Sequence, residues 1–346
     1  MKFKLESNST VQDLVVEDIA SVEALMNTLD TSSLDQAFEE LNDLQMLQQN
    51  IEKFGITEPV MDLVGGTLQS MNIRIDDKDA CLEGLVQSIA EIMKTVIDKI
   101  IEFIDKYIVG VERSCNALVA FSKKIVEDTR GGKLQFDESK FVAAAMIERS
   151  KFLDFTHDIA TLTGIVAAVV KKFDFDNPSK SISEINGVLE SNKGRTKVVG
   201  IDTIKKNAPG VFGIEVDWFV TGMSILMDGG GSESQESLTK LGYDPKRTPL
   251  DIISAADMLI SCKHTLDDIK KELRRFTKAK DDGKLETKAL ISAAKTQLPK
   301  FIKDVLNLFR TDIAVMKKLA SALRAGYGLG SITNSDKEKL VSFGKE

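Results

Sequence analysis

Histidine and cysteine, the residues that most often bind metals or transfer protons, are few in this sequence and widely spaced. The histidines are His157 and His264, and the cysteines are Cys81, Cys115 and Cys262. His157 has no histidine or cysteine three or four positions away, and Cys262 and His264, two positions apart, do not share a helix face. Because a metal site needs several such ligands to converge, the sequence predicts neither a metal centre nor a cofactor.

The cysteines also indicate the compartment. Their odd number and the lack of a CxxC pair predict reduced, mostly buried thiols in a cytosolic context. The N-terminus has no apolar core of a secretory signal, and no run approaches the ~20 apolar residues of a transmembrane helix. The longest clean apolar run, Gly164 to Val170, ends at Lys171.

Two glycine-rich stretches lack the features of phosphate-binding loops. Gly229 to Ser232 has no GxxxxGK[ST] pattern, and Gly326 to Gly330 follows a predicted helix where a dinucleotide loop would precede one. No GxSxG, HExxH or DFG motif is present. The sequence therefore predicts no catalytic or cofactor-binding residues, and an enzyme with its site in the insert of residues 181–244 is the weaker alternative.

A dense basic stretch is the one candidate binding site. On a helix, Lys271, Arg274, Arg275 and Lys278 fall on one side, where they could contact phosphates of a nucleic acid. Phe276 is the only aromatic residue among them, so the pattern does not predict base-specific recognition. A solvated helix face is the more ordinary interpretation.

The net charge of −7 conceals an asymmetry along the chain. Residues 1–80 contain 16 acidic and 5 basic residues, a balance of −11, and the rest carries a balance of +4. An acidic N-terminal region therefore precedes a mildly basic body, which can meet nucleic acid or another acidic surface.

A long amphipathic helix organises the other elements. Apolar residues recur at steps of three and four from Asp79 to Arg130. A helix continuous from Asp79 to Glu127 would run roughly 70 Å at 1.5 Å per residue. A helix of this length needs other segments against it. Its predicted apolar stripe is Leu82, Leu85, Val86, Ile89, Ile92, Met93, Val96, Ile97, Ile100, Ile101, Ile104, Ile108 and Val111.

Similar patterns predict the other helices. Helices are expected over residues 11–29, 34–54 and 59–71, from 136 through much of 141–172, and over 249–280 and 285–325. The last two are expected to form an antiparallel hairpin, with a kink at Pro299. Residues 181–231 carry only short helical signals, one short extended piece at Lys197 to Ile201 and an ambiguous apolar run, Val211 to Met227.

The predicted fold is therefore mostly α, an elongated bundle of long antiparallel helices with a small irregular insert, α or α+β. The expected divisions are an acidic short-helix region (1–75), a first bundle part (76–180), the insert with its glycine-rich loop (181–248), the helical hairpin (249–327) and a polar tail (328–346).

The order of parts resembles the internal head and other virion structural proteins of large contractile-tailed bacteriophages. In that group a maturation protease often removes an acidic leader by cutting after a glutamate preceded, two residues earlier, by a small or aliphatic residue. Ser21-Val22-Glu23 fits this pattern, and Val15-Val16-Glu17 fits it less well. The resemblance implies processing at Glu23, and removal of the acidic leader is expected to leave a chain at +4 or more, compatible with packaged DNA.

The expected function is a non-enzymatic structural or assembly protein. The expected partners are other virion proteins or further copies of the chain, with non-specific DNA contact, first in the host cytoplasm and then in the virion. The alternatives are an α-helical pore-forming or membrane-active protein, whose apolar tongue would be Gly164 to Val170 or Val211 to Met227, and a cytosolic helical adaptor.

Overall fold

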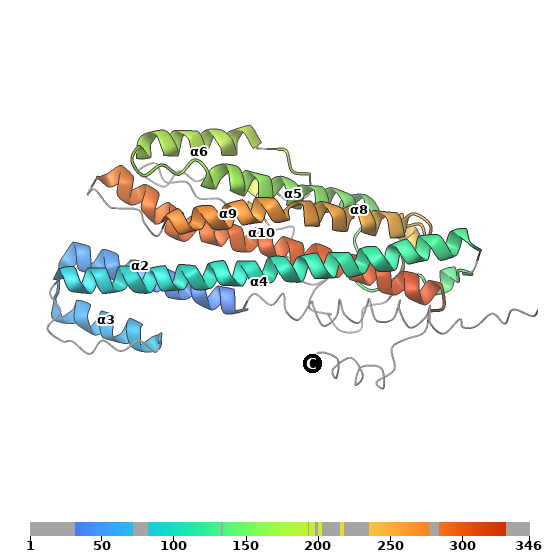
Figure 1. Cartoon of the computed structure of the whole chain (residues 1–346), viewed down its shortest axis with the longest axis horizontal. Helices are drawn as coiled ribbons and strands as arrows, with labels where there is room; N and C mark the ends of the chain where they lie inside the picture. Colours follow the sequence, from blue (N-terminus) through green and yellow to red (C-terminus); the bar gives the residue numbers. More distant parts are fainter. Residues whose placement is uncertain are drawn as a thin grey trace, which may run out of the picture.

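Helix α4 (Leu82–Arg130) forms the spine of the molecule (Figure 1). The computed structural model describes residues 32–71, 82–132, 134–192, 194–197, 200–202, 215–217, 235–276 and 284–329. α4 has 49 residues, which corresponds to about 73 Å of length. It passes through the buried Gly110 without interruption. Of the predicted stripe residues whose side chains are described, Ile92 is half-buried and the others are buried: Ile89, Met93, Val96, Ile97, Ile100, Ile101, Ile104, Ile108 and Val111.

Two N-terminal helices follow one side of the spine. α2 (Ser32–Phe54) lies antiparallel to α4, and its predicted stripe is buried at Leu41, Leu44, Leu47 and Ile51. α3 (Glu58–Ser70) turns back at Gly55, whose φ of +69° suits glycine. Among the described elements α3 packs mainly on α2, so it lies at the edge of the bundle. The helix predicted over residues 11–29 lies outside the described residues.

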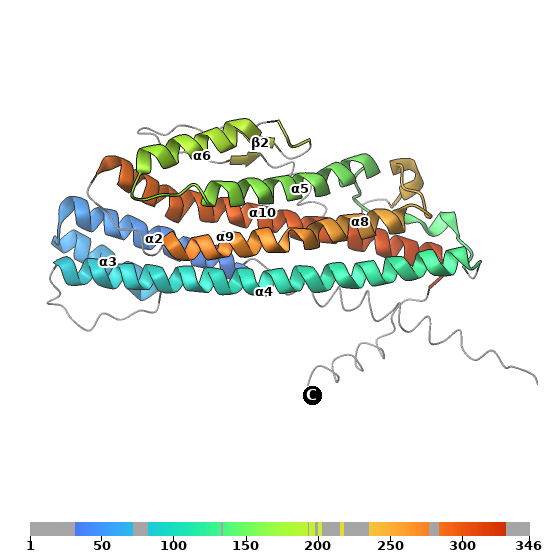
Figure 2. The same ribbon diagram turned by 45° about the horizontal axis from the view of Figure 1, so that its top comes forward.

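The other long helices complete the bundle, as Figure 2 shows from a second direction. α10 (Leu285–Gly326) runs beside α4 and α5 (Arg149–Val170), and α8 (Thr248–Ser261) and α9 (Lys263–Phe276) fill the space between them. α10 continues as helix through Pro299. The mostly α, elongated bundle that the sequence predicts is confirmed.

The prediction of one helix over residues 249–280 is wrong in detail, because α8 and α9 are separated at Cys262. The Ser261 hydroxyl and the Cys262 thiol both donate to the carbonyl of Met258, at 2.6 and 3.3 Å. Such side-chain bonds compete with the backbone hydrogen bonds that continue a helix.

The helix expected from residue 136 is also wrong over its first part. Only a 3₁₀ turn, η1 (Glu138–Lys140), forms, and strand β1 (Val142–Ala143) follows it. β1 pairs antiparallel with β4 (Glu236–Ser237), just before the 3₁₀ turn η2 (Leu238–Leu241). This long-range pairing and the positive φ of Ala145 prevent helix formation until Arg149.

The insert is described only in part. α6 (Pro178–Asn192) packs on α5, and strands β2 (Gly200–Asp202) and β3 (Glu215–Asp217) pair antiparallel. The described part is thus α+β, one of the two predicted forms. Most of the run Val211 to Met227 and the loop Gly229 to Ser232 lie outside the described residues.

Helix α5 is the part of the structure to compare with the expectation that no segment spans a membrane. Within the described part of the chain it is the one helix that is long and apolar enough to do so, and 61% of its most apolar window is buried inside the bundle. Its apolar surface is therefore largely used in packing against α8, α9 and α10.

Candidate interaction site

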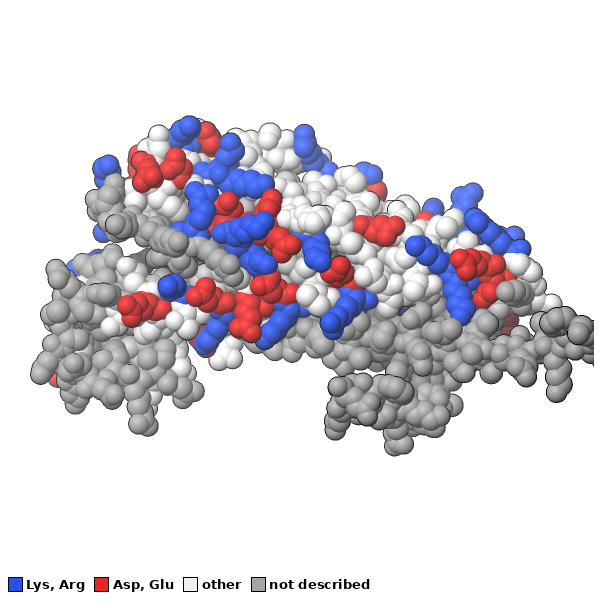
Figure 3. All heavy atoms as spheres, in the orientation of Figure 1, with Lys and Arg blue, Asp and Glu red and all other residues white. Residues whose placement is uncertain are grey.

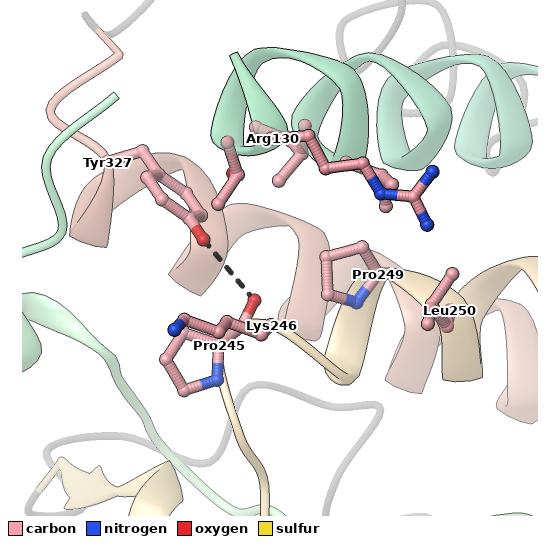
Figure 4. A pocket seen from close by; sticks show the side chains of 9 residues that line it. Arg130, Pro245, Lys246, Pro249, Leu250 and Tyr327 are labelled. Atoms are coloured by element: carbon pink, nitrogen blue, oxygen red, sulfur yellow. Dashed lines mark hydrogen bonds between the residues drawn. The ribbon is translucent and has the colours of Figure 1, made fainter. Parts of the chain in front are cut away.

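A cavity of about 320 Å³ lies where the C-terminal ends of α4 and α10 meet the start of α8. We call it the end cavity (Figure 4). Its volume is near the lower limit for pockets that hold small molecules or large side chains. Its walls are mostly apolar, with polar groups at Thr129, Arg130 and Lys246. The lining residues are Ile125, Val126, Thr129, Arg130, Pro245, Lys246, Pro249, Leu250 and Tyr327.

The turn that forms one wall is fixed by its own side chains. Asp244 accepts hydrogen bonds from the backbone N–H groups of Lys246 and Arg247, at 2.7 and 3.1 Å. The preceding Gly242 has a φ of +84°, which a residue with a side chain rarely adopts. Tyr243, held by a 3.0 Å hydrogen bond from its hydroxyl to the carbonyl of Ile147, anchors the turn to the segment before α5.

A bidentate ion pair fixes the start of α8. Arg149 donates from Nε and Nη2 to Asp251 at 2.6 and 2.8 Å, in the fork geometry that makes such pairs strong. The hydrogen bond to Asp251 raises the pKa of the Arg149 guanidinium. This pair ties α8 to α5 directly behind the wall of the end cavity.

The polar groups of the end cavity favour an anionic or mixed apolar and anionic partner. The Tyr327 hydroxyl donates to the carbonyl of Pro245 at 3.4 Å, and the buried hydroxyl of Thr129 has no partner among the described residues. Arg130 and Lys246 are exposed, and no carboxylate of the described residues forms an ion pair with either. An unpaired cation beside an apolar surface can be neutralised by a partner without first breaking an internal ion pair.

The basic side chains predicted to contact nucleic acid are partly neutralised. Lys271 lies 3.6 Å from Asp268, and Arg275 pairs with Glu272. Both cations are exposed on α9, so contact with phosphate would compete with these carboxylates. The side chain of Arg274 is not described, and Lys278 and the processing candidate Glu23 lie outside the described residues.

Several ion pairs lie along α9. Figure 3 shows basic (blue) and acidic (red) side chains mixed over this part of the surface. Lys263 pairs with Glu112 at 2.6 Å, and Lys270 bridges to Asp105 of α4. Lys171 of α5 also pairs with Asp268 at 3.1 Å, and its hydrogen bond lowers the pKa of that carboxyl. This face therefore carries alternating charges.

A small polar cluster lies in the core. Asp312 is fully buried, and its Oδ1 accepts a 3.0 Å hydrogen bond from the Thr156 hydroxyl, while its Oδ2 has no partner among the described residues. Burial raises the pKa of Asp312 to about 8. Burial also raises the pKa of Cys115, and it raises that of Cys262 to about 11. Both thiols are therefore protonated at neutral pH, and neither is an activated nucleophile.

The described residues contain no group of three or more metal-binding side chains. His157 is exposed, with its nearest carboxylate, Asp158, 3.8 Å away, and Cys81 lies outside the described residues. Comparisons of the chain with protein-family models, curated proteins and solved structures find no significant match.

The sequence does not predict the end cavity, because its walls come from three separate segments, around residues 125–130, 245–250 and 327. The sequence at the start of α8 indicates a turn with two cations, at Pro245, Lys246, Arg247 and Pro249. Nothing in the sequence indicates that these residues face the end of α4. The burial of Asp312 was not predictable either, since an aspartate that follows Arg310 and Thr311 is typical of an exposed helix position.

Proposed function

We propose that this chain is a non-enzymatic structural protein of a large contractile-tailed bacteriophage, an internal head protein that binds other virion proteins. The observation that carries the proposal is the bundle itself, a rod whose long helices bury their apolar stripes in a shared core and expose charged flanks. A rod of this kind offers a large contact area on several sides. The acidic leader and the order of parts, which resemble those of such virion proteins, support the same function.

The proposed processing changes the charge less than complete loss of the acidic region would. Cleavage after Glu23 removes five acidic and two basic residues, so the net charge would rise from −7 to −4. A balance of +4 requires removal of residues 1–80, which include α2 and α3. Because α2 packs along α4, we propose cleavage at Glu23 with α2 retained. Cleavage after Glu23 therefore leaves the net charge below the expected value of +4.

Contact with packaged DNA is proposed as a secondary, non-specific role. Lys271 and Arg275 are exposed on α9, and contacts of this kind bind phosphate without reading bases. Their ion pairs with Asp268 and Glu272 predict weak binding that falls as the salt concentration rises.

Mass spectrometry of purified particles tests the proposal. We expect the chain to be present in the particles with an intact mass that begins at Ala24. A full-length chain in the particles would contradict the processing step alone, whereas absence of the chain from particles would contradict the structural role.

A membrane-active protein is the second candidate, and the length and apolarity of α5 favour it. This function requires α5 to leave the bundle and expose its buried face. Leakage of dye from liposomes at low concentrations of the purified chain would support it, and intact liposomes under conditions that loosen the bundle would count against it.

A further inference from the structure

The turn between α2 and α3 exposes large apolar side chains at one end of the bundle. Phe54, Ile56 and Leu63 are 55%, 41% and 45% exposed. Few large apolar residues of the described chain are this exposed. These three lie within ten consecutive positions, around the connection between α2 and α3. A concentration of exposed apolar side chains at one place is typical of a protein contact.

The two helices that this turn joins are acidic. Residues 32–71 contain seven acidic residues and one basic residue, Lys53. Glu58 and Asp62 of α3 are exposed next to Leu63, and no cation of the described residues forms an ion pair with either. We call Phe54, Ile56, Glu58, Asp62 and Leu63 together the acidic end.

The end cavity lies at the opposite end of α4 and has the complementary properties (Figure 1). Its walls are apolar, it is large enough to receive an aromatic or branched side chain, and Arg130 and Lys246 stand at its edge. Arg247, which is also exposed, adds a third cation in the adjoining turn. Oδ1 of Asp244, the carboxylate of this turn, accepts hydrogen bonds from two backbone N–H groups of the same turn.

We propose that copies of this chain associate end to end, with the acidic end of one copy bound in the end cavity of the next. Phe54 or Ile56 would fill the apolar cavity, while Glu58 and Asp62 would pair with Arg130 and Lys246. Complementary charge would orient the two copies and speed their encounter, and the buried apolar side chain would supply most of the affinity.

The two surfaces lie at opposite ends of a ~73 Å helix, so one molecule cannot satisfy its own contact. The contact is heterologous, because two different patches meet, and such contacts generate rings or open chains of copies. This inference rests on the proposed function, in that it names a second copy as one of the protein partners.

Sedimentation velocity of the purified full-length chain tests the contact, with two charge-reversal variants. Glu58→Lys/Asp62→Lys makes both ends basic, and Arg130→Glu/Lys246→Glu makes both ends acidic. We expect the unmodified chain to form larger species as its concentration rises at low salt, and fewer at high salt. Each variant alone should remain monomeric, and an equimolar mixture should associate again, because each end then finds its complement only in the other protein.

Controls separate this contact from other causes of association. Lys106→Glu/Arg113→Glu reverses the same number of charges midway along α4 and should leave association unchanged. The double variant Phe54→Ser/Ile56→Ser should weaken association by at least about tenfold, whereas Val109→Ser, at an exposed apolar residue midway along α4, should not. Circular dichroism confirms that each variant retains its helix content.

A monomeric wild-type chain at every concentration would overturn the inference, as would association that persists in both charge-reversal variants or a mixture that stays monomeric. None of these results would affect the proposed function, since detection of the chain in purified particles does not depend on self-association.

Discussion

The buried carboxyl of Asp312 shows how the core tolerates a polar group. Its one hydrogen bond, from Thr156, does not replace the water that an ionised carboxylate requires. The group therefore keeps its proton, and burial raises its pKa from 3.8 to about 8. Retaining a proton that the unfolded chain would release costs stability at neutral pH.

The sign of this effect gives a prediction. Between pH 4 and pH 8 the folded state holds a proton that the unfolded state has lost, so this contribution lowers the free energy of unfolding as pH rises, by roughly 1.4 kcal/mol per pH unit. Below this window both states are protonated, and above it both are ionised. Asp312→Asn should flatten the curve and raise the unfolding free energy at pH 7 by on the order of a few kcal/mol.

Urea denaturation at several pH values checks this prediction. Asp98→Asn, at an exposed position of α4, serves as the control and should change the unfolding free energy at pH 7 by less than about 0.5 kcal/mol. If Asp312→Asn left the pH dependence as it is in the wild type, the proton would not reside on Asp312.

Gly326 gives a second prediction at the residue scale. A Cβ at this position would lie 2.4 Å from Cε2 of Phe136, whose ring packs on Tyr327 beside the end cavity. Gly326→Ala should therefore destabilise the fold by about 1–3 kcal/mol, measured by thermal or chemical denaturation. Phe136→Leu in the same chain should recover part of the loss, and a neutral effect of Gly326→Ala would mean that the ring has room to move.

At the scale of elements, α3 contains two glycines that its packing does not require. A Cβ at Gly65 or Gly66 would meet no atom within 4 Å, and both residues are exposed in the middle of a helix. Gly65→Ala and Gly66→Ala should each stabilise α3 by up to about 1 kcal/mol. Hydrogen exchange of the α3 amides measures this effect locally. Unchanged or faster exchange in both variants would contradict it.

Long helices were predictable because their apolar residues repeat at helical spacing over many turns. The stripes of α2, α4 and α10 correspond to buried side chains over most of their described lengths. The elements that were missed depend on contacts with distant residues or on side-chain bonds. The pairing of β1 with β4 replaces the start of a predicted helix, and Ser261 and Cys262 interrupt another.

For the candidate site, the sequence shows which residues are basic but not which of them lie beside a cavity. Lys271 and Arg275 are exposed on α9, where they pair with Asp268 and Glu272, three positions earlier on the same helix. Arg130 and Lys246 are 116 positions apart, so nothing in the sequence connects them. The fold brings them to the edge of one cavity.

At the scale of the whole molecule, charge and exposed apolar surface are distributed unequally between the two ends. The acidic end lies at the start of α3 and the end cavity lies beside the last turn of α4, so neither can be covered by the other within one copy. This distribution is what the proposed end-to-end contact between copies requires.

Cross-linking of lysines in purified particles, followed by mass spectrometry, tests this account most directly. Lys53 adjoins Phe54 at the acidic end, and Lys246 lines the end cavity. A cross-link between them must join two copies, because within one chain they lie near opposite ends of a ~73 Å helix. The account predicts this cross-link, together with cross-links to other virion proteins. Particles that lack the chain, or that contain it with cross-links only within single copies, would contradict the account.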